Sequence, residues 1–120
     1  KKGKGFSPLI IETEYWGQMP HPNLMVENTV EEVGDLLGAL SHHRGELERN
    51  PFHLRLPAWM QDNVRRGAEV VGGQGGDAPD FSFATLYRVN RWKNENLVPA
   101  WSGGKMLPSS ECSKESLLKA

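Results

Sequence analysis

The stretch from Thr29 to Leu47 constrains the fold most, because it begins with a complete start signal for an amphipathic helix. The hydroxyl of Thr29 suits the backbone N–H groups of a first helical turn, and Glu32 follows three residues later, so the pair forms a capping box. Apolar residues then recur at steps of three or four, or multiples of them, and form one apolar stripe: Val30, Val33, Leu37, Leu40 and Leu47. Asn50-Pro51 is predicted to end this helix.

A second stripe of the same helix consists of small residues, namely Gly34, Gly38, Ser41 and Gly45. Each glycine lowers helix stability by roughly 1 kcal/mol relative to alanine. Three of them in one helix indicate that another element packs very close to this face.

The remaining elements predict an α/β domain at residues 1–92, with the order strand, strand, helix, helix, strand. Alternating or apolar runs indicate strands at 8–16, 24–26 and 81–92. A second helix is expected at 57–71, after a linker at 51–56 and with Pro57 in its first turn. Residues 93–120 are polar and are expected to form a flexible tail.

Composition excludes several classes of function. The net charge of −1 and the lack of clustered Lys and Arg argue against nucleic-acid binding. No apolar run approaches the roughly 20 residues of a membrane span, and no signal peptide is visible. Cys112 is the only cysteine, so an internal disulfide is impossible, and we expect a reducing, cytoplasmic location.

One family shares the pattern around the first helix. The segment Pro22-Asn23-Leu24-Met25-Val26-Glu27, a turn, and a helix containing Ala39-Leu40-Ser41-His42-His43-Arg44-Gly45-Glu46 resemble the C-terminal part of the PIG-L, or LmbE-like, deacetylases. The resemblance runs from about residue 8 to residue 92 and includes Asn63-Val64-Arg65-Arg66-Gly67. Gly45-Glu46 depart from it, since the family often has Ser-Gln there.

The resemblance implies part of a Rossmann-like sheet from a zinc-dependent deacetylase that acts on N-acetylglucosamine-type sugars or glycoconjugates. The zinc-binding H-P-D-D/E and H-x-x-H segments of that family are absent from this chain. His21-Pro22-Asn23 is only superficially similar to H-P-D, because asparagine cannot act as a general base. The zinc ligands would therefore belong to an N-terminal half of the same domain, and the isolated chain is expected to be inactive.

Four residues are candidates for substrate binding, and none is a candidate for catalysis or metal binding. His43 matches the family's histidine in A-L-x-x-H and would line the substrate cleft, although it could equally be a partly exposed helix histidine. Arg65 and Arg66 would bind a sugar phosphate or a carboxylate, or else form a solvated face with Asp62 and Glu69. Trp16 would stack on a sugar ring.

A second reading of the chain is a non-catalytic α/β module that binds a carbohydrate or a protein, since the metal motif is missing. In either case the apolar and small-residue faces of the first helix exceed what one short helix could cover. We therefore expect a fragment of a longer protein that, when isolated, is marginally stable or forms a homo-oligomer.

Overall fold

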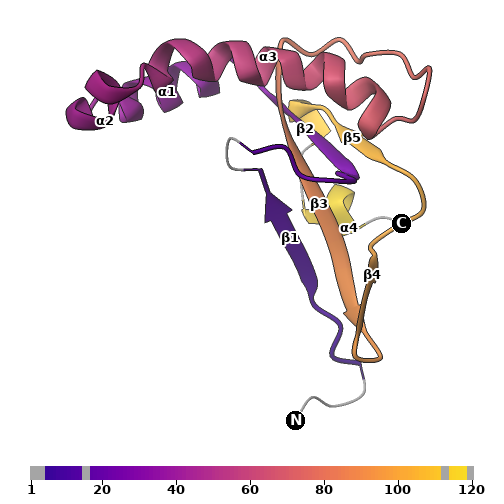
Figure 1. Ribbon diagram of the computed structural model, residues 1–120. Helices are drawn as coiled ribbons and strands as arrows, with labels where there is room; N and C mark the ends of the chain where they lie inside the picture. The colour runs from indigo at the N-terminus through magenta and orange to yellow at the C-terminus, as the bar shows by residue number, and fades with distance from the viewer. Residues whose placement is uncertain (1–4, 15–16, 112–113, 119–120) are drawn as a thin grey trace.

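The computed structural model describes residues 5–14, 17–111 and 114–118, and these form a mixed α/β fold on one sheet (Figure 1). Within these residues the sheet has five strands, β1 (Leu9–Thr13), β2 (Leu24–Asn28), β3 (Phe83–Lys93), β4 (Asn96–Pro99) and β5 (Lys105–Leu107). Strand β3 has β1 on one edge, with β2 and β4 end to end on the other, all antiparallel to it. Strand β5 pairs with β2 in parallel. The α/β class is thus confirmed.

The alternation predicted for the strand at 81–92 is confirmed in β3. Ala84 and Leu86 are buried on the face that helix α3 (Phe52–Val70) covers. Val89 is buried on the opposite face. Because β3 is covered on both faces, it forms the shared wall of two apolar clusters.

Helix α3 starts earlier than predicted. The linker expected at 51–56 is instead the first part of this helix. Two backbone N–H groups of the first turn donate to the carbonyl of Pro51, so the helix forms ahead of Pro57. The missing N–H of Pro57 then removes one backbone hydrogen bond, and the helix continues through it.

The capping box at Thr29 is confirmed and begins helix α1 (Val30–Leu40). The backbone N–H of Glu32 donates to Thr29 Oγ1 at 3.1 Å, and the N–H of Thr29 donates to Glu32 Oε1 at 2.8 Å. The expectation of one helix up to Asn50 is wrong. Ser41 Oγ donates to the carbonyl of Gly38 at 2.6 Å, and a tight turn follows before helix α2 (Arg44–Arg49).

The chain after residue 92 differs from the expected polar tail. It forms β4, β5, a 3-10 turn η1 (Ser109–Glu111) and a short helix α4 (Lys114–Leu118). Trp101 and Leu107 are buried in the same apolar cluster as Val89, and this contact anchors the segment to the sheet. Few but large apolar side chains thus outweigh the polar composition that favoured a tail.

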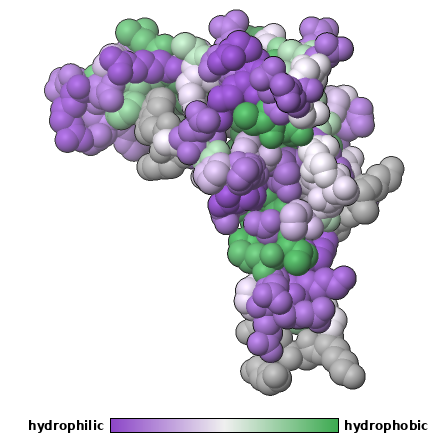
Figure 2. All heavy atoms as spheres, turned by 45° about the vertical axis from the view of Figure 1, so that its right-hand side comes forward, coloured by the Kyte–Doolittle hydropathy of each residue, from purple (hydrophilic) through white to green (hydrophobic). Residues whose placement is uncertain are grey.

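An arm projects from the sheet and is made of α1, α2 and the first part of α3, residues 52–59 (Figure 1). The buried residues of α3 begin only at Met60, beyond the arm. Exposed apolar side chains lie along it, among them Val30, Leu36 and Leu54. Figure 2 shows the arm standing clear of the body, with hydrophobic and hydrophilic residues mixed on the visible face.

The dimensions of the molecule reflect this arm. The radius of gyration is 16.1 Å, whereas a compact domain of this length has roughly 13.6 Å. The accessible surface is 8188 Å², about 1,700 Å² more than the roughly 6,500 Å² of a compact monomer of this mass. None of the described helices combines the length and the apolar content that a membrane span requires.

Two helix glycines provide a test of which faces are covered. A Cβ on Gly38 would meet nothing within 4 Å, whereas a Cβ on Gly67 would lie 2.2 Å from Met25 Cε and 3.0 Å from Leu86 Cδ2. We therefore expect Gly38→Ala to raise the free energy of unfolding by about 1 kcal/mol through helix propensity. Gly67→Ala should lower it by about 1–3 kcal/mol through overpacking.

Urea unfolding followed by circular dichroism measures both changes, and each variant serves as the control of the other. A loss of stability in Gly38→Ala would mean that a second copy or another element covers the small-residue face in solution.

Candidate functional site

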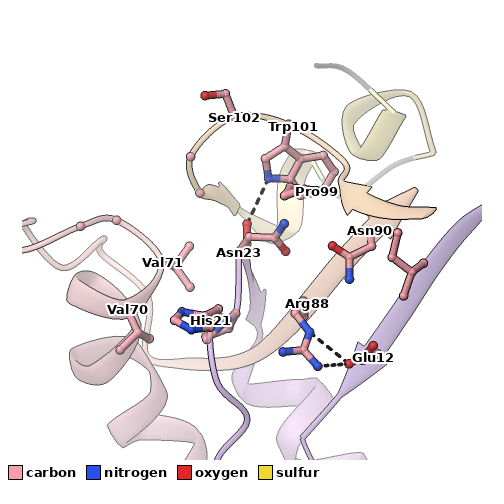
Figure 3. A pocket seen from close by; sticks show the side chains of 16 residues that line it. Glu12, His21, Asn23, Val70, Val71, Arg88, Asn90, Pro99, Trp101 and Ser102 are labelled. Atoms are coloured by element: carbon pink, nitrogen blue, oxygen red, sulfur yellow. Dashed lines mark hydrogen bonds and ion pairs between the residues drawn. The ribbon is translucent and has the colours of Figure 1, made fainter. Parts of the chain in front are cut away.

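A cavity of about 860 Å³ lies where α3 ends and the sheet continues without a helix over it. Its floor is the part of β1 and β3 that α3 does not reach, and its walls come from residues 21–23, 70–73 and 101–104 (Figure 3). The polar lining comes from Glu12, His21, Asn23, Arg88, Asn90 and Ser102, and the apolar lining includes Val70, Val71, Leu97, Pro99 and Trp101.

Asn23 holds the wall of this cavity together. Its side chain completes the sheet in the gap between β2 and β4, because Nδ2 donates to Val89 O at 2.9 Å and Oδ1 accepts the Val89 N–H at 2.7 Å. Its own carbonyl accepts Trp101 Nε1 at 3.2 Å and the Lys105 N–H at 3.0 Å. Asn23 therefore joins β2, β3 and the loop before β5.

The floor carries an ion pair between β1 and β3. Arg88 donates from Nε and Nη2 to Glu12 Oε1, and from Nη1 to the carbonyl of Pro20 at 2.7 Å. The side chains of Arg88 and Glu12 are 28% and 39% exposed, so both remain accessible from the cavity. His21 lies beside them with a backbone φ of 57°, the left-handed region that few non-glycine residues adopt.

Two Gly-Gly pairs, Gly72-Gly73 and Gly103-Gly104, form the far wall of the cavity. A Cβ on Gly104 would lie 1.9 Å from the carbonyl oxygen of Val71, so only glycine permits this loop to approach the end of α3. Gly73, with a φ of 100°, donates its N–H to Glu69 O and ends the helix as predicted. No local pattern in the chain connects the two pairs.

A second cavity, about 680 Å³, lies between α3 and residues 76–82, and Arg65 is on its rim. Arg65 pairs with Asp62 at 2.7 Å, and both side chains are largely exposed. The Asp62 carboxylate raises the pKa of Arg65, and Arg65 lowers the pKa of Asp62. Stability from the lowered pKa would be lost as the pH falls through it, but an exposed pair contributes little.

The structure does not bring the predicted substrate-binding residues together. His43 is exposed on the arm as the residue before α2. Arg65 lies on the second cavity, and Arg66, which is half-buried, donates to Glu14 and Asn63. Trp16 lies outside the described residues.

Sequence reasoning missed most of the polar groups that do come together. The alternation of the predicted strand at 81–92 puts Arg88 and Asn90 on the same face, but it does not show that α3 leaves this part of the strand uncovered. Asn23 was recognised as part of a scaffold motif, yet its bonds to Val89 depend on a strand 66 residues away.

The described residues include no group of three or more His, Cys, Asp or Glu side chains that could hold a metal ion. We compared the chain with family models, curated proteins and solved structures, and none of the three comparisons gave a match.

Proposed function

We propose that this chain is the scaffold and cleft-wall portion of a zinc-dependent deacetylase acting on N-acetylglucosamine-type sugars. The proposal combines the resemblance to PIG-L or LmbE-like enzymes with the position of Pro22-Asn23, which form the entry to a central strand beside a polar cavity. The mixed sheet would then be part of a larger Rossmann-like sheet, in a cytoplasmic enzyme.

The observation that carries the proposal is the large accessible surface of the chain. Its surface exceeds that of a compact monomer by about 1,700 Å². One protein in a standard interface contributes about 800 Å², so the excess is enough for a substantial covering partner. The N-terminal half of the same domain is the partner that we propose.

The outer edge of β1 is one place where this half would attach. The N–H of Val89 is bonded to Asn23, and its carbonyl to Asn23 and Ala100, all on the side away from β1. Ile11 lies opposite Val89. In an antiparallel pair, the backbone N–H and C=O groups of two such opposite residues point away from each other, so those of Ile11 point to the free edge of β1. Among the described strands none pairs with this edge, and Ile11 is 51% exposed.

The cavity would be the wall of the sugar cleft. The Arg88–Glu12 pair, the Asn90 amide and the Ser102 hydroxyl offer both donors and acceptors, as sugar hydroxyl groups require. Contacts from His43, Arg65 or Arg66 remain a prediction, and all three lie apart from this cavity. The described residues include no group that fits a zinc site, so the metal would be held by the other half.

Two measurements test the function. Metal analysis and an acetate-release assay on N-acetylglucosamine conjugates should give neither zinc nor turnover for the isolated 120 residues. The product of the full source gene should give both, and it should contain an H-P-D-D/E motif upstream of Lys1. A gene without that motif would contradict the proposal. Sugar binding by a gene product that has no deacetylase activity would favour the alternative, a carbohydrate-binding module.

Light scattering tests whether the exposed surface instead pairs with a second copy of the chain. A monomer with a cooperative melting transition above about 65 °C would contradict both the missing half and the homo-oligomer.

A further inference from the structure

A largely buried ionic cluster connects α3 to Glu14, the residue that follows β1. Arg66 Nη1 donates to Glu14 Oε2 at 3.0 Å, and Arg66 Nη2 donates to Glu14 Oε1 at 2.5 Å and to Asn63 Oδ1 at 2.7 Å. The side chains of Arg66 and Glu14 are 13% and 1% exposed. Asn63, fully buried, donates from Nδ2 to the carbonyl of Ala84 at 2.9 Å.

The same carboxylate also holds a loop. Glu14 Oε2 accepts the backbone N–H of Met19 at 3.0 Å. The next residue, Pro20, offers its carbonyl to Arg88 Nη1 at 2.7 Å. Residues 17–20 are therefore fixed at two adjacent points, one set by Arg66 through Glu14 and the other by Arg88.

Stability alone does not account for this cluster. Replacing a buried ion pair with apolar side chains of similar size is often neutral or stabilising, because the charges lose hydration. What apolar groups cannot replace is the planar fork of arginine, which orients a carboxylate through two parallel bonds. The oriented carboxylate in turn fixes the position of the Met19 N–H.

We propose that Arg66 is a positioning residue for the cavity: through Glu14 it fixes residues 17–20, and through Pro20 it fixes the guanidinium of Arg88 on the cavity floor. This gives Arg66 a role other than contact with a ligand. The inference relies on the proposed function only for the identity of the cavity as a cleft wall.

The double variant Glu14→Met/Arg66→Met tests the inference in the full 120-residue chain by NMR. Hydrogen exchange of the Met19 amide should accelerate at least about tenfold relative to the Val89 amide, because a hydrogen bond to a charged group is lost. The Nε–H signal of Arg88 should shift and broaden. Asp62→Ala/Arg65→Ala removes the neighbouring exposed pair of α3 and should change neither signal.

Unchanged Met19 exchange and an unchanged Arg88 signal in the folded double variant would overturn the inference. If that variant does not fold, Arg66→Lys keeps the positive charge but cannot bond both carboxylate oxygens and Asn63 together. It should still accelerate Met19 exchange, and parental exchange rates there would equally overturn the inference. No sugar or zinc enters these measurements, so their failure is separate from failure of the proposed function.

Discussion

Asn23→Ala is expected to lower the free energy of unfolding by about 2–4 kcal/mol. The substitution removes both side-chain hydrogen bonds to Val89. The Val89 carbonyl keeps the N–H of Ala100 as a donor, but the N–H of Val89, a fully buried residue, loses its hydrogen bond to Asn23. Leaving a buried donor unpaired costs about 1–3 kcal/mol, in addition to the net value of each lost bond. Urea unfolding at neutral pH measures the change.

Asn23→Asp is the matched control for this experiment. Aspartate keeps an oxygen to accept the Val89 N–H, but it has no donor for the Val89 carbonyl. We expect it to be destabilised by less than Asn23→Ala. A change below about 0.5 kcal/mol in Asn23→Ala would show that water or a backbone shift replaces the side chain, and that the gap between β2 and β4 needs no asparagine.

Arg66→Met alone should have the largest effect of any single substitution considered, a loss of about 3–5 kcal/mol. The change leaves Glu14 with a carboxylate that is 1% exposed and has lost its cation. Among the described residues, the N–H of Met19 is then the only remaining donor to the Glu14 carboxylate. Thermal and urea unfolding should agree on the size of this loss.

Adding Glu14→Met to that variant should restore much of the lost stability, since two apolar side chains then replace the ion pair. The difference between the single and double variants is a coupling energy, which a double-mutant cycle isolates. Additive losses in Arg66→Met and Glu14→Met would mean that the two residues do not act as a pair.

Local signals predicted the parts of the fold that depend on neighbours in sequence. The capping box at Thr29 and the alternation of β3 involve residues within a few positions of each other, so the sequence alone identifies them. The early start of α3 was missed because Pro57 is an ordinary first-turn residue, and nothing local shows that a turn already forms at Pro51.

Contacts between distant segments account for the rest. Glu14 and Arg66 are 52 residues apart, and Arg88 meets Glu12 across 76 residues. Whether a charged residue faces solvent or a partner depends on the register of strands and on where a helix ends. For this reason Arg66 looked like a solvated or ligand-binding arginine, and the cavity residues carried no signal of their own.

Helix α3 separates two surfaces of the molecule. Its first residues belong to the arm, and its last residue, Val70, lines the cavity together with the C-cap residue Val71. At 1.5 Å per residue, its 19 residues span about 28 Å. A partner seated on the arm would therefore leave the cavity open. Ligands at the two surfaces would then bind independently, and their binding free energies would add, unless a movement of α3 couples the two sites.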